Sequence, residues 1–347
     1  MANLIYNVND TAVQILAAKQ IKENLFVDLL HRNGRGLTEQ TETNASTIRM
    51  LKYAPITASA REVGASTNGG FFNNSGADIG QVTEYDLNLT YLYDKMIDIP
   101  EVQQDMCPAN LFDAANKNIG GRVATEINAS TIAAQIKAVY DAAGAENTPK
   151  WGGHAVVLAS TPKYYESFMD ASVALDDGDE ANGIQSFPTD AREFIMRPTY
   201  RKGLMSQNGV LLGGSNFAQS MLAKGGIDPE SRKENGSMYV GEIDLIPCFV
   251  APAPIWNRAK TWLSDATVVD GVQAVMCAAS ATDRGISTQE YVKVIDSPDG
   301  AGKRLQPKVR WGVNVCYHKG IVPILANGTA APTSKGDTLT MKAPGNV

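Results

Sequence analysis

The sequence predicts a mixed α+β protein built around one long helix, and three features of its 347 residues support this fold class. Apolar side chains recur at helical spacing through residues 109–140. Residues 47–99 have the pattern of two long strands around a polar, glycine-rich tip. Short apolar strands follow the helix as far as residue 325, and they need a surface to pack on. The long helix is therefore expected to be the element around which the chain is organised.

The predicted helix begins after Pro108, because proline suits the first helical position, where a missing N–H costs nothing. Gly120 and Gly121 weaken its middle by about 1 kcal/mol each relative to alanine, and such a pair is typical of a bend or a close backbone approach. Residues 128–130 offer a place where the helix can be capped again. The apolar stripe that should be buried consists of Leu111, Ala115, Ile119, Val123, Ile127, Ile132, Ile136, Val139 and Tyr140.

The two strands before the helix form a predicted hairpin that has no core of its own. The outgoing strand runs from about residue 47 to 56, and the returning strand alternates apolar and polar side chains from residue 86 to 94. An isolated two-stranded ribbon is at best marginally stable in water, so its apolar side chains need another surface. That surface belongs either to the hairpin's own domain or to a neighbouring molecule, and the pattern alone leaves both open.

The other elements are predicted from shorter patterns. Residues 11–30 are expected to form an amphipathic helix in an N-terminal arm, and a second short helix is expected over residues 161–169 with Thr161 as its cap. We expect the two strands around residue 300 to pair as a hairpin, and Pro323 to place the last strand at a sheet edge. The predicted strands cover residues 154–159, 243–250, 272–278, 291–295, 309–317 and 321–325.

Composition excludes several classes of protein. A formal charge of −6 and a pI near 5.2 argue against a dedicated nucleic-acid binder, which usually carries a basic excess. The four cysteines lie far apart, which predicts free thiols in a reducing cytoplasm and neither a zinc site nor a disulfide framework. No secretory signal and no apolar run long enough to span a bilayer are visible in the sequence. We therefore expect a soluble intracellular product.

No pattern of catalytic residues is apparent. The sequence lacks a phosphate loop, a dinucleotide-binding glycine motif, a nucleophile elbow and a zinc-protease motif. An acidic cluster at Asp176, Asp177, Asp179 and Glu180 offers carboxylate oxygens to a cation, but a solvated loop is the simpler interpretation. The sequence therefore predicts neither an enzyme nor a bound cofactor or metal. Two groups of basic residues could meet phosphates or carboxylates of a neighbouring subunit, but solvated faces are the simpler interpretation. The groups are Arg192, Arg197, Arg201 and Lys202, and then Lys303, Arg304, Lys308 and Arg310.

The order of these elements resembles a known architecture. An arm, a long hairpin, a spine helix, an inserted α/β unit and returning strands resemble the major capsid protein of tailed bacteriophages, whose Hong Kong 97-like fold is shared with encapsulin shells. The resemblance covers about residues 45–326 and is one of architecture. Local segments also look like the family's apolar strand ending in proline and its closing strands, and they are residues 241–252, 273–277, 291–295, 311–315 and 321–325.

The resemblance implies a division of the chain into five parts. They are an N-terminal arm (1–46), an extended hairpin loop (47–100), a peripheral domain with the spine helix (101–150 and 284–326), an axial domain around the centre of a capsomer (151–283) and a flexible C-terminal tail (327–347).

The resemblance also implies a structural protein that self-assembles as pentamers and hexamers into an icosahedral head. That head would enclose double-stranded DNA without sequence-specific contacts and without a membrane. The expected partners are a separate scaffolding protein and a portal, with or without a decoration protein, and the location is the virion capsid after assembly in the host bacterial cytoplasm. The candidates for contact between subunits all lie in the hairpin loop, at Arg61, Glu62, Phe71, Phe72, Asn73, Asn74, Leu87, Leu89 and Tyr91.

Two alternatives to a phage head follow from the same observations. An encapsulin-type nanocompartment would have the same fold, would bind a cargo peptide and would need neither portal nor scaffold. A cytoplasmic α/β enzyme would use the hairpin as a dimerisation arm, and it would need a deep pocket with convergent titratable groups.

A shell of this protein is expected to be held together without covalent bonds. Some members of the family join subunits through an isopeptide bond between a lysine in the extended loop and an asparagine of a neighbour. Here no lysine lies between Lys52 and Lys95, so the tip of the loop cannot supply one. Assembled shells boiled in denaturing buffer should therefore give one gel band at the subunit mass of 37.2 kDa. A ladder of linked subunits would contradict this expectation.

Overall fold

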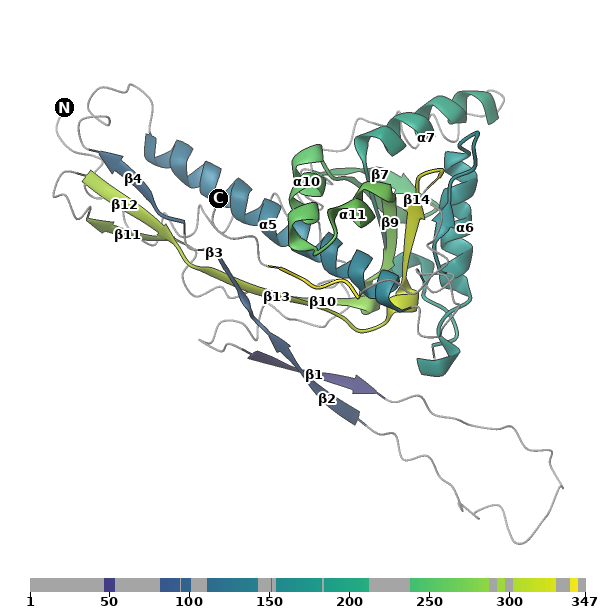
Figure 1. Ribbon diagram of the computed structural model, residues 1–347, viewed down its shortest axis with the longest axis horizontal. Coiled ribbons are helices and arrows are strands. Elements are labelled where there is room, and N and C mark those ends of the chain that lie inside the picture. Colours follow the sequence, from purple (N-terminus) through teal and green to yellow (C-terminus); the bar gives the residue numbers. More distant parts are fainter. Residues whose placement is uncertain are drawn as a thin grey trace, which may run out of the picture.

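The computed structural model describes residues 47–53, 82–93, 95–100, 111–142, 151, 154–182, 184–211, 238–286, 292–296, 302–328 and 338–342. These residues form an elongated body of helices and strands, with a two-stranded ribbon outside it (Figure 1). The predicted α+β class is confirmed. The predicted N-terminal helix and the tip of the hairpin lie outside the described residues.

The long helix, α5 (Leu111–Asp141), is a single element of 31 residues that crosses the body diagonally in Figure 1. At about 1.5 Å per residue it spans about 46 Å. The predicted second cap does not form, because the hydroxyls of Ser130 and Thr131 donate to the carbonyl of Ile127 at 2.9 and 2.8 Å inside a continuous helix. A Cβ on Gly121 would meet nothing within 4 Å. The close backbone approach that the glycine pair predicted is therefore absent at Gly121.

Six strands form the main sheet, in the order β5-β14-β9-β6-β8-β7. The pairs β5–β14 and β6–β8 are parallel and the other three pairs are antiparallel. The strands are β5 (Val156–Val157), β6 (Arg192–Met196), β7 (Tyr239–Ile243), β8 (Ile246–Val250), β9 (Val272–Ala278) and β14 (Ile321–Leu325).

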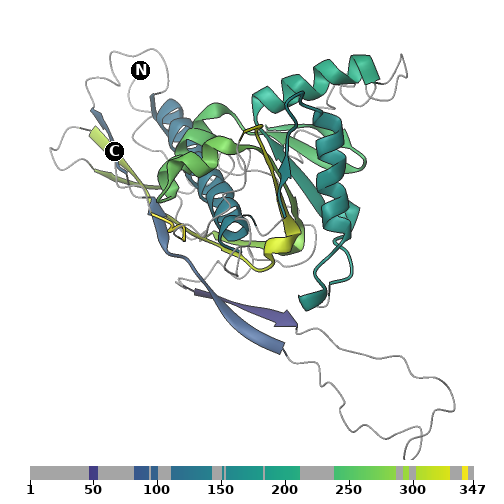
Figure 2. The same cartoon turned by 45° about the vertical axis from the view of Figure 1, so that its right-hand side comes forward.

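Helices cover both faces of this sheet. Helices α6 (Tyr164–Asp176) and α7 (Pro198–Leu211) lie on one face, and α10 (Ala253–Trp262) and α11 (Ala266–Gly271) lie on the other, where α10 packs against α5 (Figures 1 and 2). Short 3₁₀ turns connect the elements, at Glu180–Asn182, Thr189–Ala191, Ala279–Ala281 and His318–Gly320.

Two three-stranded sheets complete the body, in the orders β10-β13-β3 and β11-β12-β4. All their pairs are antiparallel. Strands β12 and β13 follow each other directly, with Lys308 between them, so one extended run joins both sheets. The strands are β3 (Tyr91–Tyr93), β4 (Ile97–Pro100), β10 (Thr282–Ile286), β11 (Val292–Asp296), β12 (Gly302–Pro307) and β13 (Val309–Val315).

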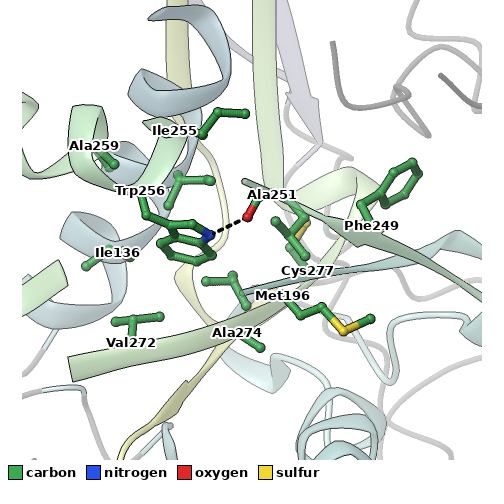
Figure 3. Packing of buried hydrophobic residues seen from close by; sticks show 14 of the residues in the cluster. Ile136, Met196, Phe249, Ala251, Ile255, Trp256, Ala259, Val272, Ala274 and Cys277 are labelled. Atoms are coloured by element: carbon green, nitrogen blue, oxygen red, sulfur yellow. Dashed lines mark hydrogen bonds between the residues drawn. The ribbon is translucent and has the colours of Figure 1, made fainter. Parts of the chain in front are cut away.

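The helix and the main sheet share one hydrophobic core. Trp256 on α10 is fully buried at its centre, close to Ile136 of α5 and Val272 of β9 (Figure 3). Its indole N–H donates to the carbonyl of Ala251 at 3.1 Å, so burial leaves no unsatisfied donor there. Most of the apolar stripe predicted for the long helix is buried in this core, with Ile119, Val123, Ile127, Ile132, Ile136 and Val139 at most 1% exposed. Ala115 and Tyr140, at the two ends of the described stripe, are only partly buried.

Several predicted elements differ from the structure. Residues 243–250 are not one strand, because the chain reverses at Asp244 and Leu245 between β7 and β8. Both residues have a positive φ, of 52° and 64°, as a tight hairpin turn of the primed type requires. The strand that pairs with β11 is β12 and not residues 309–317, which pair instead with β10 and β3.

The predicted start of the second helix is also wrong. Helix α6 begins at Tyr164, with Lys163 at the cap position and no side-chain capping bond, so Thr161 is not the cap. The helix continues to Asp176, well beyond the predicted end. The hydroxyl of Ser167 instead donates to the Lys163 carbonyl at 2.8 Å. Local capping patterns are weak signals when packing of the helix decides its length.

Two predictions about the C-terminal part are wrong as well. Strand β14 is internal, and Pro323 is tolerated because β5 pairs with Ile324 and Leu325 but not with Pro323. Strand β14 therefore lies in the main sheet, although the predicted boundaries assign it to the part with the spine helix. Residues 338–342 are not loose: Leu339 is 4% exposed, and its N–H donates to Asp141 at the end of α5 at 3.0 Å.

Candidate functional site

The feature of the fold with the clearest functional potential is the point where the hairpin joins the body. Strand β1 (Thr47–Tyr53) pairs antiparallel with β2 (Val82–Asn88) over seven residue pairs, which confirms a hairpin. The returning strand lies earlier than the predicted residues 86–94, because the second half of that range forms β3 and does not pair with β1. The chain then continues from β2 into β3, which pairs with β13 of the body. Within the described residues, β2 is the only strand that pairs with β1. The ribbon formed by β1 and β2 lies outside the body in both views (Figures 1 and 2).

The inner strand of the ribbon crosses β13 at Gly312. A Cβ built on Gly312 would lie 2.1 Å from the carbonyl oxygen of Asn88, a distance that real side chains do not tolerate. Leu87 and Leu89, on either side of Asn88, are 1% and 7% exposed. Glycine is therefore required at this position so that the two backbones can touch, as is typical of a glycine within a strand. We call this contact between Asn88 and Gly312 the hairpin crossing.

Three aromatic rings anchor the chain directly after the hairpin crossing. The ring of Tyr91 meets the ring of Trp262 edge-on, with centroids 4.6 Å apart, and lies 5.9 Å from the ring of Trp311. The two indoles are themselves 6.1 Å apart. Offset and edge-on geometries of this kind stabilise aromatic pairs beyond the area they bury. The half-buried phenol stays neutral, because burial raises the pKa of Tyr91 above its ordinary value.

Both indoles of this cluster are hydrogen-bonded to the long helix. The indole N–H of Trp311 donates to the Ser130 hydroxyl at 2.9 Å, and that of Trp262 donates to a carboxylate oxygen of Glu126 at 3.1 Å. The other carboxylate oxygen of Glu126 accepts from Arg258 in an ion pair. The two buried indoles of Trp262 and Trp311 therefore connect α5 to the point where the ribbon leaves the body.

The predicted contact residues fall into two groups. Leu87 and Leu89 are already covered by their own chain, which argues against a direct side-chain contact with a neighbour. Tyr91 is partly exposed and packs within the aromatic cluster. The other six, Arg61, Glu62, Phe71, Phe72, Asn73 and Asn74, lie outside the described residues, so their role in contacts between subunits stays a prediction.

The acidic cluster does not form a common site. Asp176 pairs with the buried Arg192, whereas Asp179 is 1% exposed and accepts from Asn182 at 2.6 Å, with the Lys319 ammonium 3.4 Å away. In the part of the chain that the structure describes, no three side chains of the metal-binding types gather at one point. Among the same residues, no helix has the length and apolar character needed to cross a membrane.

Some of the basic residues predicted as solvated are structural. The guanidinium of Arg192 is completely buried, and it donates to the Ser172 carbonyl at 2.9 Å, the Ser172 hydroxyl at 2.7 Å and the Phe187 carbonyl. Arg197 lies over the Trp256 ring, 4.4 Å from its centroid, and donates to the carbonyls of Val269 and Val272. Burial lowers the pKa of Arg197 from its ordinary value.

Comparisons with known proteins give the fold a context. No protein-family model and no curated protein matches the sequence. Among solved structures, a chain from the capsid of Ralstonia phage GP4 gives a TM-score of 0.54 at 8% identity, over 89% of this chain and 87% of that one. The mature capsid of bacteriophage PhiM1 and the capsid of cyanophage P-SCSP1u each give 0.50, at 10% and 12% identity. These matches cover 83% of this chain and 84% and 86% of the others.

The chain therefore shares the fold of phage capsid proteins. The resemblance drawn from the sequence is confirmed at the level of architecture. The sequence did not reveal the hairpin crossing as a site. The one signal for this crossing in the sequence is a glycine inside a strand, between Trp311 and Val313.

The close contact at the hairpin crossing can be tested with a matched pair of variants. Gly312→Ala should lower the free energy of unfolding by about 1–3 kcal/mol, because the methyl group forces β2 away from β13. The control Gly121→Ala should leave stability unchanged or raise it by up to about 1 kcal/mol, since its Cβ enters open space in a helix. Urea unfolding of the dissociated subunit measures the free energy of unfolding of both variants. Equal changes in the two variants would contradict a close backbone contact at Gly312.

Proposed function

We propose that this protein is the major subunit of a tailed-phage head: it assembles as pentamers and hexamers into an icosahedral shell around double-stranded DNA. The observation that carries the proposal is a capsid-type fold whose ribbon is anchored at one end and extends away from its own body. Strand β1 pairs with β2 and, within the described chain, with no strand of the body. A neighbouring subunit offers the surface that this ribbon lacks.

The energetics of the ribbon favour coupling between assembly and folding. Two strands alone are at best marginally stable, whereas two strands laid on another molecule bury their apolar faces. Partner binding then adds directly to the stability of the ribbon. Each contact is weak by itself, but every subunit both gives and receives one, so the contacts add over a closed shell.

The acidic character of the chain is compatible with DNA inside the shell. A formal charge of −6 gives little general attraction to phosphates. In this proposal the genome is held by confinement and its charge is balanced mainly by small cations, so no sequence-specific DNA site is needed.

The proposal includes the division of labour that the resemblance implies. The part around α5, with the sheets β10-β13-β3 and β11-β12-β4, would be the peripheral domain, and the six-stranded sheet with its helices would be the axial domain. A separate scaffolding protein and a portal are the proposed partners, with or without a decoration protein. The proposed location is the virion capsid, with assembly in the host cytoplasm.

A shortened hairpin tests the proposal directly. Replacing residues 54–81 with Asn-Gly closes the ribbon after its last pair, Tyr53 with Val82, using a favoured two-residue turn. Electron microscopy and light scattering of the unaltered chain, alone and with candidate scaffolding proteins, should show shells, rings of five or six, or tubes. The shortened chain should keep the same thermal transition but form none of them.

Each outcome of this experiment has a meaning. A monomer or dimer of the unaltered chain under all conditions would contradict a shell protein. Shells that form without any scaffold and bind a cargo peptide would favour an encapsulin. Normal shells from the shortened chain would contradict the role of the hairpin.

A further inference from the structure

Two exposed features at opposite ends of β8 have complementary chemistry. The first is the β7–β8 turn at Asp244 and Leu245. Leu245 is 72% exposed, more than any other large apolar side chain in the described chain. Its φ of 64° and the φ of 52° at Asp244 lie in the left-handed region, which disfavours residues other than glycine, asparagine and aspartate. The fold therefore holds an apolar side chain in solvent on a backbone that leucine rarely adopts.

The charges around the β7–β8 turn are acidic. Asp244 and Glu242 are exposed beside Leu245. Neither carboxylate has an ion-pair partner among the residues that the structure describes. The turn thus presents a leucine flanked by two negative charges to whatever lies outside the subunit.

The second feature is an open hollow at the other end of β8, between that strand and α7. Met205 in its wall is 48% exposed, and the Nε of Arg201 is buried without a hydrogen-bond partner. Lys202 is exposed, and neither cation has an ion-pair partner in the described part of the chain. The hollow is lined by apolar side chains, two basic ones and one hydroxyl, without any acidic one. These residues are Pro198, Arg201, Lys202, Met205, Ser206 and Val250.

The turn of a subunit cannot reach the hollow of the same subunit. The turn directly precedes Ile246 at the start of β8, and the hollow lies at Val250 at its end. Five residues of strand, at about 3.4 Å each, separate the two by roughly 17 Å. An occupant that matches the hollow in charge and polarity must therefore come from a second molecule. A contact between two different patches of identical chains closes into a ring when the rotation fits.

We propose that Leu245 of one subunit inserts into the hollow of the next subunit around a ring. Glu242 and Asp244 then face Arg201 and Lys202 across the contact. This inference rests on the proposed shell function and assigns one of its subunit contacts. The occupant is a second copy of this chain, because the same molecule carries both halves of the complementary pair.

Replacing Leu245 should affect assembly without lowering the stability of the subunit. Asparagine tolerates a positive φ, so Leu245→Asn should leave the melting temperature of the subunit unchanged or raise it. Loss of an apolar anchor should raise the subunit concentration needed for half-maximal assembly about tenfold. The control Val173→Thr, at an apolar side chain of α6 that is 55% exposed, should assemble normally. Normal assembly of Leu245→Asn would overturn the inference.

Charge reversal and cross-linking identify the occupant. Asp244→Lys and Lys202→Glu should each weaken assembly, and the double variant should restore it. In assembled particles, Leu245→Cys combined with Met205→Cys should form a disulfide between subunits when oxidised glutathione is supplied as the electron acceptor. Non-reducing gels should then show ladders up to five or six subunits, whereas either single variant should show none.

The outcomes distinguish this inference from the proposed function. If the unaltered chain forms no rings or shells under any condition, the shell function fails and this contact fails with it. If the unaltered chain forms shells but the double cysteine variant forms shells without a ladder, only the docking of Leu245 is overturned. A ladder together with charge rescue establishes the contact.

Discussion

The backbone contact at the hairpin crossing determines where the ribbon joins the body. The backbones of Asn88 and Gly312 touch there, which forces the chain to pass from the ribbon into β3 along one path. The rings of Tyr91, Trp262 and Trp311 then fix that path to the body, and two indole N–H groups fix it to α5. Because α5 also packs in the core shared with the main sheet, these hydrogen bonds connect the hairpin crossing to the rest of the body.

The body and the ribbon differ in how much of a core each has. The body has one continuous core that includes α5, α10 and the main sheet, so it has what a domain needs to fold alone. The ribbon is buried only where it meets the body, at Leu87 and Leu89. Among the described residues, its outer strand β1 pairs with β2 and with no other strand. The body therefore has a core of its own, whereas the ribbon needs a further surface to cover its apolar side chains. The proposed contact through Leu245 uses a separate part of the surface, at the β7–β8 edge of the main sheet and along α7.

Most of the long-range architecture follows from sequence patterns, and the local details do not. The helix stripe through Ile119 and Ile136 and the pairing of β1 with β2 are predictable, because periodicity over many residues leaves few alternatives. The turn at Asp244 and Leu245 is not, since neither residue is glycine and Asp244 is the only polar residue in the otherwise apolar run from 243 to 250. The burial of Arg192 depends on acceptors from Ser172 and Phe187, which only the folded chain brings together. The crossing at Gly312 likewise depends on a contact between residues more than two hundred positions apart.

Hydrogen exchange of backbone amides shows whether a neighbouring subunit completes the ribbon. The exchange of β1 and of β13 is compared between dissociated subunits and assembled shells. We expect weak protection of β1 in the subunit and strong protection in the shell, while β13, which is paired on both sides within the body, is protected in both. Equal protection of β1 in the two states would mean that the ribbon is complete within a single chain, and the proposed contact with a neighbour would be wrong.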